Sequence, residues 1–402
     1  MKKIDGGILS PLGYRGAAVA AGLKRSKLDL ALLLSDKEAV AAGAFTTNLV
    51  KAAPVVYSEE LVKGGKPVRA LMVNSGNANA ATGEQGRADV KASLTFAAQE
   101  LQIKEEEILL CSTGVIGVPL PMDKVLNGIK ECATNLGSSA NDLAQAILTT
   151  DTFTKEVAVE IDLGGKAVRL GGMAKGSGMI HPNMATMLAF VTTDGVVERE
   201  LLQKFLNESV AESYNMISVD GDTSTNDTLL ALANGASGVV IKEGSKEAQL
   251  FQEAFNYVNT QLAKMIAQDG EGATKLITVE VQGATSVEDG RTLARSIVSS
   301  NLVKTAFFGS DANWGRILCA MGYSGANFNP EKVALTYSSV VGQIEVFREG
   351  LPLLFNEERA KEILLEREIT LLVELSEGSG KATAWGCDLS YDYVKINGDY
   401  RS

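Results

Sequence analysis

Short apolar runs alternate along the chain with longer segments in which apolar residues recur about every 3.6 positions. The short runs are typical of buried strands and cover 28–34, 70–73, 108–110, 188–192, 277–281 and 369–375. The segments with helical periodicity cover 88–101, 122–136, 139–148, 198–214 and 246–267. This mixture predicts an α/β or α+β fold with several sheets. A chain of 402 residues exceeds what one hydrophobic core usually serves, so we expect two or more lobes.

The composition and charge of the chain narrow the set of partners. Apolar residues make up 45% and charged residues 22%, as in ordinary globular proteins. The net charge is −11 without any basic block, so nucleic acid is not expected as a partner. No window approaches the length of an apolar membrane span. The start "MKKIDGGILS" breaks before an apolar stretch forms, so it does not resemble a signal peptide, and we expect a cytoplasmic protein.

Cysteine and histidine are too few and too scattered for a metal site. The four cysteines lie far apart (Cys111, Cys132, Cys319 and Cys387), and His181 is the single histidine. We therefore expect free thiols and no metal. Apolar residues before Cys111 predict a buried strand, which disfavours a nucleophilic thiol there. Any Ser-His-Asp arrangement would depend on His181 alone, so an acyl-transfer enzyme built from this chain needs another base.

Glycine is frequent and gathers in loops. There are 40 glycines, and six loops read "NSGNANAATGEQG", "STGVIGVP", "GGMAKGSG", "DGDTSTND", "DGEGATK" and "FGSDANWG". Because glycine lets the backbone approach a ligand closely, these loops together favour a pocket lined by main-chain donors. The lysine in "GGMAKGS" precedes the second glycine, so the Walker phosphate loop is not matched. No G-x-G-x-x-G pattern opens a helix after a strand, so nucleotide binding is weakly supported.

The segment "SVDGDTSTND" (218–227) has two spaced carboxylates, Asp220 and Asp222, as a calcium loop has. Its glycine is misplaced and no glutamate closes the loop, so the calcium pattern fails. Two interpretations stay open, a solvated turn and a structural loop near a site.

The run "AKGSGMIHPNMATMLAF" (174–190) places Thr186 after a small residue, Ala185, and before an apolar run. A threonine hydroxyl is a poor nucleophile unless a base takes its proton. An economical base is the α-amino group of the same threonine, whose ordinary pKa near 8 suits neutral pH. That chemistry requires cleavage of the Ala185–Thr186 bond. From spacing alone, a threonine that merely begins a strand is the simpler interpretation.

With these residues in view, the chain resembles the ornithine acetyltransferase family, also called bifunctional glutamate N-acetyltransferases, of arginine biosynthesis. The resemblance covers essentially the whole chain. It rests on several long motifs in order: "STGVIGVPLPM", "TTDTFTK", "AKGSGMIHPNMATMLAF", "SVDGDTSTNDT", "QDGEGATK", "GSDANWGRI" and "NGDYRS".

The resemblance implies a reaction and a set of residues. It implies self-cleavage between Ala185 and Thr186 into an α chain (1–185) and a β chain (186–402). The freed Thr186 takes an acetyl group from N2-acetylornithine and passes it to glutamate by a ping-pong route. Thr113 and Gly114 supply the oxyanion hole. The implied substrate contacts are Thr152, Lys175, Thr186, Glu271, Asn397 and Ser402, the last standing where many relatives carry threonine.

The resemblance also implies a fold and an assembly. The expected fold is a two-lobed αββα-type sandwich similar to that of self-processing aminopeptidases, with the cleaved chains held together as an α2β2 heterotetramer. No cofactor is implied, and the use of acetyl-CoA as a second acetyl donor stays open. A self-cleaving aminopeptidase or amidohydrolase of similar fold is the rival enzyme. A non-enzymatic binding protein is the third alternative, and it predicts an intact chain.

Overall fold

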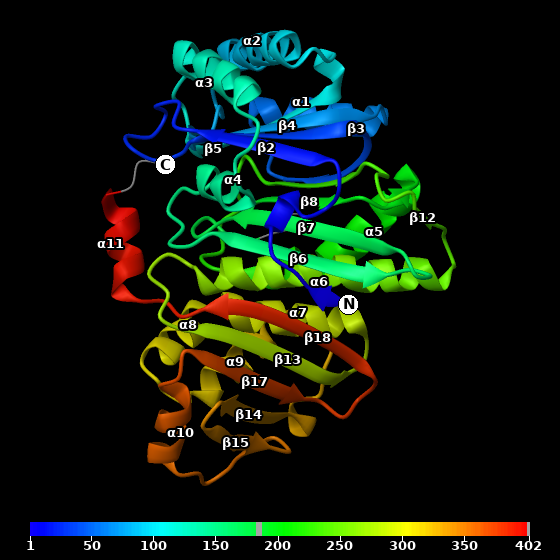
Figure 1. Cartoon of the computed structure of the whole chain (residues 1–402). Helices are drawn as coiled ribbons and strands as arrows, with labels where there is room; N and C mark the ends of the chain where they lie inside the picture. The colour runs from blue at the N-terminus through cyan, green and yellow to red at the C-terminus, as the bar shows by residue number, and fades with distance from the viewer. Residues whose placement is uncertain (182–186, 400–402) are drawn as a thin grey trace.

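The computed structural model describes residues 1–181 and 187–399, which form two lobes stacked one above the other (Figure 1). The larger lobe is built on one mixed sheet. In order of hydrogen bonding, its strands are β1 (Lys2–Lys3), β6 (Lys155–Asp162), β7 (Ala167–Lys175), β8 (Leu188–Thr193), β11 (Thr228–Ala233), β3 (Leu30–Phe45), β4 (Val68–Asn77) and β5 (Ile108–Val115), and β2 (Tyr14–Val19) pairs with β3. The register of β3 shifts between Leu34 and Ala39. The first half of β3 pairs with β2 and β4, and its second half pairs with β11. The sheet is therefore bent into two layers, and β3 runs from one layer into the other.

Both faces of these layers are buried, which explains their nearly continuous apolar runs. In β3, Leu30 and Leu32 face outward against helices, whereas Ala31 and Leu33 face the space between the two layers. The side chains of β8 likewise alternate between the helix-covered face of their layer and the space between the two layers. The core between the layers is therefore separate from the cores under the helices.

Helices cover the outer face of each layer. The helices α2 (Gly83–Leu101) and α3 (Met122–Thr134) cover one layer, and α5 (Arg199–Glu212) and α6 (Lys246–Gln268) cover the other. Side chains of α1 (Ala53–Gly64) and α4 (Ala140–Ala146) contribute to the core between the layers. The order is helix, sheet, sheet, helix, so the αββα fold class is confirmed.

The smaller lobe holds a second mixed sheet. In order its strands are β10 (Ile217–Ser218), β18 (Gly380–Cys387), β13 (Leu276–Ala284), β17 (Glu368–Glu374), β14 (Ala334–Ser339), β15 (Gly342–Arg348) and β16 (Leu351–Pro352). Its helices are α7 (Val287–Ser299), α8 (Asn301–Phe308), α9 (Trp314–Gly322) and α10 (Glu357–Leu364), and α7 packs on β13 and β18. The last helix, α11 (Tyr391–Asp399), runs back along the side of the molecule toward the larger lobe (Figure 1).

The remaining elements are short. They are the strand pair β9 (Val196–Val197) and β12 (Val240–Ile241) and the 3-10 helices η1 (Gly7–Leu9), η2 (Glu105–Glu107), η3 (Tyr214–Met216) and η4 (Pro330–Lys332). Within residues 1–181 and 187–399, no helix combines the length and the apolar character needed to cross a membrane.

Each strand and helix predicted from periodicity is present. Most boundaries are shifted by a few residues, but the strand predicted at 28–34 continues to Phe45. The expected division into 1–185 and 186–402 is a cleavage boundary and stays a prediction. The strands β8 and β11 come after residue 186, yet they lie in the same sheet as β7 and β3. If the chain is cleaved there, both products contribute strands to one sheet.

Candidate active site

A pocket of about 340 Å³ lies where the ends of β5 and β7 meet the starts of β8 and β11. Its wall combines segments that are far apart in the sequence. Four residues implied by the resemblance line it: Thr113, Gly114, Lys175 and Glu271. Asn397 of α11 lines it as well. Five of the expected site residues therefore meet in one cavity.

Gly114 is held against the neighbouring strand β4. In the parallel register of β4 and β5, Gly76 stands opposite Gly114. The φ angle of Gly114 is 132°, and a Cβ at this position would lie 2.5 Å from the backbone nitrogen of Asn77. Only glycine fits such a conformation at such a distance. The backbone at 113–114 is therefore rigidly placed in the pocket wall, as an oxyanion hole requires.

The loop 218–227 supports this wall from the other side. The side-chain amide of Asn226 donates hydrogen bonds to the carbonyls of Ala78 (2.6 Å) and Ser112 (2.8 Å), which ties the loop to β4 and β5. Asp220 accepts hydrogen bonds from the backbone of Met179 (2.6 Å) and Ile180 (2.8 Å). These contacts, together with its place in the pocket wall, favour the structural loop over the solvated turn.

Asp227 ends this loop, opposite Met187 in the extension of the β8–β11 register. It is buried in the pocket wall, and its Oδ2 atom has no hydrogen-bond partner within the described part of the chain. Burial raises the pKa of Asp227 well above its usual range, against the opposing effects of the Ser224 hydroxyl and the Lys175 charge. Burial thus favours the protonated form of this carboxyl group, which lies where the chain enters β8.

Lys175 supplies the positive charge of the pocket. It is the last residue of β7, it pairs with Leu188, and only 8% of it is exposed. Among residues 1–181 and 187–399, its ammonium group forms no hydrogen bond or ion pair, so it is available to a ligand. Charge attraction to a carboxylate is the simplest use of such a group.

Glu271 supplies a negative charge across the pocket. Its backbone N–H donates to the carbonyl of Ser177 (2.9 Å), and its Oε2 accepts a hydrogen bond from Asn397 (2.7 Å). A Cβ at Gly178 would lie 2.6 Å from Oε1 of Glu271, so this glycine leaves room for the carboxylate. The arrangement can hold a ligand that has a carboxylate at one end and an ammonium group at the other.

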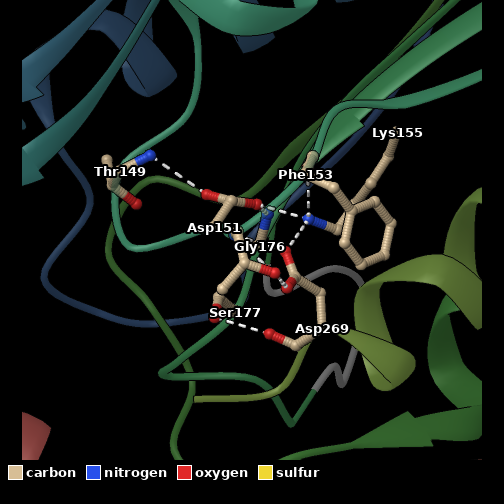
Figure 2. A network of polar contacts seen from close by, with 8 residues as sticks. Thr149, Asp151, Phe153, Lys155, Gly176, Ser177 and Asp269 are labelled. Atoms are coloured by element: carbon tan, nitrogen blue, oxygen red, sulfur yellow. Dashed lines mark hydrogen bonds and ion pairs between the residues drawn. The ribbon is translucent and has the colours of Figure 1, made fainter. Parts of the chain in front are cut away.

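Thr152 lies outside the wall of this pocket, with its hydroxyl and its backbone N–H donating to Asp269. Figure 2 shows the network behind it, in which the ammonium group of Lys155 lies between Asp151 (2.7 Å) and Asp269 (2.5 Å). The sequence analysis missed this network. "TTDTFTK" and "QDGEGATK" contain all three residues, but nothing in the motifs says that they pair.

Ala185, Thr186 and Ser402 lie outside the described residues. Ile180, two residues before the stretch 182–186, and Met187, directly after it, both line the pocket.

The lone histidine and the cysteines take no part in the pocket wall. Nδ1 of His181 lies 3.0 Å from the hydroxyl of Ser218, and burial together with Arg295 lowers the pKa of His181. Cys111 is buried in β5, and burial raises the pKa of its thiol, so it is no nucleophile, as predicted. Within the described residues, no group of three or more His, Cys, Asp or Glu side chains is placed to hold a metal ion.

The pocket thus combines a rigid backbone wall, a cation and a carboxylate within an αββα fold. A model of the ArgJ family matches residues 15–402. The arginine biosynthesis bifunctional protein ArgJ of Caldanaerobacter subterraneus subsp. tengcongensis is 54% identical over 404 residues, covering 100% of both chains. ArgJ 1 of Clostridium acetobutylicum is 52% identical over 392 residues, covering 97% of this chain and 96% of the relative.

A solved structure is also similar. The crystal structure of arginine biosynthesis bifunctional protein ArgJ from Bacillus halodurans has 42% sequence identity and a TM-score of 0.50, and it covers 52% of this chain and 98% of its own. The chain therefore belongs to the ArgJ family and is an acyltransferase.

Proposed function

We propose that the chain transfers an acetyl group from N2-acetyl-L-ornithine to L-glutamate in the cytoplasm, as a step of arginine biosynthesis. The observation that carries this proposal is the pocket itself. It gathers Thr113 and Gly114, Lys175 and Glu271 around the point where the chain enters β8, directly after Thr186. A carboxylate-binding cation and an ammonium-binding carboxylate match the two charged ends of an amino-acid substrate.

Transfer begins when the hydroxyl oxygen of Thr186 attacks the acetyl carbonyl carbon and its proton passes to the α-amino nitrogen of Thr186. The bond from this carbon to the ornithine nitrogen then breaks, the proton moves to that nitrogen, and the acetyl group stays on threonine as an ester. The α-amine of glutamate attacks the ester, N-acetylglutamate leaves, and the threonine hydroxyl regains its proton. Thr113 and the Gly114 backbone stabilise the oxyanion in both steps.

Self-cleavage between Ala185 and Thr186 precedes this reaction, because an α-amino group at Thr186 exists only after that bond breaks. The two products, 1–185 and 186–402, stay together because β8 pairs along its whole length with β7 and β11 pairs along its whole length with β3. The solved Bacillus halodurans chain matches about half of this one over nearly all its own length, as a cleaved half would. We further propose pairing of two such αβ units, acetyl-CoA as a second donor and no resident cofactor.

Mass spectrometry of the denatured protein tests the proposal. Exposure to N2-acetylornithine without glutamate is expected to add one acetyl group to the fragment that begins at Thr186. The Thr186→Ala variant is expected to stay uncleaved and unacetylated, because the hydroxyl is needed for both steps. A single full-length species in the wild type would refute the mechanism, and release of acetate with no transfer to glutamate would favour a hydrolase. Replacing acetylornithine by acetyl-CoA in the same assay tests the second donor.

A further inference from the structure

Behind the pocket, Lys155 carries a charge that is completely buried. It is the first residue of β6, and its side chain is 0% exposed. Its ammonium group pairs with Asp151 and with Asp269, and it lies 4.8 Å from the centre of the Phe153 ring. An ammonium group without partners in such a place would be strongly unfavourable, so both ion pairs are needed to hold it.

Each carboxylate of this cluster also holds a different loop (Figure 2). Asp151 accepts hydrogen bonds from the backbone of Thr149 (3.0 Å) and Gly176 (2.6 Å). Asp269 accepts from the backbone of Thr152, and its own carbonyl accepts from the hydroxyl of Ser177 (2.6 Å). Lys155 therefore joins three segments, 149–152, 175–177 and 269–271.

These three segments carry both charged groups of the pocket. Lys175 precedes Gly176 directly, and Glu271 follows Asp269 by two residues and bonds to Ser177. Burial by itself would raise the pKa of Asp151, but the charges of Lys175 and Lys155 hold it well below its usual range, so it stays anionic beside both lysines. The distance between the cation and the carboxylate of the pocket is thus set through the cluster.

We propose that the Asp151–Lys155–Asp269 cluster is a positioning device that fixes Lys175 and Glu271 at the separation that the amino-acid substrate requires. Lys155 touches no substrate and acts through its two partners. The inference rests on the proposed function for the identity of the substrate. It also assigns a second task to the cluster, which is to hold the two cleavage products together. Lys155 belongs to 1–185 and Asp269 to 186–402, so the Lys155–Asp269 ion pair crosses between the two chains after cleavage.

The test is the Lys155→Met variant, with Lys304→Met as the matched control. Lys304 is equally buried, at 1% exposed, and its ammonium group donates to the carbonyl of Cys387, away from the pocket wall. We expect Lys155→Met to be cleaved at residue 185 like the wild type, because self-cleavage has no bound amino acid to position. Its KM for acetylornithine and for glutamate should both rise, with kcat/KM about 100-fold lower, as a displacement near 1 Å produces. Lys304→Met should keep the wild-type KM values.

Lys155→Met leaves two buried carboxylates without their shared cation, so a second variant guards against misfolding. The double variant Lys155→Met/Asp269→Asn removes one negative charge together with the cation, so it should fold. It should nevertheless show the same rise in both KM values. Wild-type KM values in a folded double variant would overturn the inference, as would an equal rise in Lys304→Met. A wild-type protein that transfers no acetyl group would instead overturn the proposed function, so the two failures are distinguishable.

Discussion

The backbone of Gly114 passes so close to β4 that even a methyl group collides with it, so Gly114→Ala tests the rigid wall of the pocket. The new Cβ would lie 2.5 Å from the nitrogen of Asn77 and 2.8 Å from Cα of Gly76, and both are backbone atoms that cannot rotate away. Overpacking of this kind costs about 1–3 kcal/mol. The φ angle of 132° adds strain of about 1–3 kcal/mol for any residue with a Cβ. We expect the free energy of unfolding to fall by about 2–6 kcal/mol.

The variant Gly117→Ala separates the cost of the positive φ angle from the cost of the collision. Gly117 lies just beyond β5 with a φ of 78°, and a Cβ there would meet no heavy atom within 4 Å. This control therefore carries the strain of positive φ without the collision. Thermal unfolding of both variants should give a clearly lower midpoint for Gly114→Ala, since the difference of about 1–3 kcal/mol is the collision alone.

Steady-state kinetics then connect the collision to function. If the strand moves by about 1 Å to accommodate the methyl group, the proposed oxyanion donor at 114 moves with it, and kcat should fall about 100-fold. The KM for acetylornithine should change far less, because the donor acts in the transition state. Equal midpoints and equal kcat values for Gly114→Ala and Gly117→Ala would refute the reasoning.

Two further predictions concern single side chains, and a third concerns metal. Thr113→Ala should lower the rates of enzyme acetylation and deacetylation alike, by about 100- to 1,000-fold in rapid-quench assays, while a normal rate with weakened binding would move Thr113 to ground-state recognition. Asp227→Asn should stabilise the protein increasingly as pH rises. The wild type loses stability above the ordinary aspartate pKa of about 3.9, where the unfolded chain releases a proton that the folded chain retains. The difference in thermal midpoint between Asp227→Asn and the wild type, taken at pH 5 and at pH 8, measures this gain in stability, and the exposed Asp222→Asn is the control. A gain in midpoint that is the same at both pH values would contradict the prediction. Acetyl transfer should survive dialysis against a chelator, since the scattered cysteines and the one histidine offer no cluster of metal ligands. A loss of activity that added zinc restores would overturn this prediction.

Much of the fold and part of the site follow from the sequence alone, because they depend on neighbouring residues. Apolar periodicity predicts the strand at 188–192 and the helix at 246–267, and the apolar run before Cys111 predicts its burial. All three are confirmed. The motif order predicts the family, which the comparisons confirm. The roles of Thr186 and Ser402 stay predictions, since both lie outside the described residues.

The tertiary structure decided what depends on residues that are distant in the chain. Lys155 and Asp269 pair across 114 positions, and Asn226 reaches Ser112 across 114 as well. Lys155 begins β6, a strand that none of the apolar runs in the sequence predicts, and its partner is set by how β6 lies against the end of α6. Likewise Asp227 faces the pocket because β11 runs parallel to β8. Strand order and register come from the packing of whole layers, so no run of neighbouring residues encodes them.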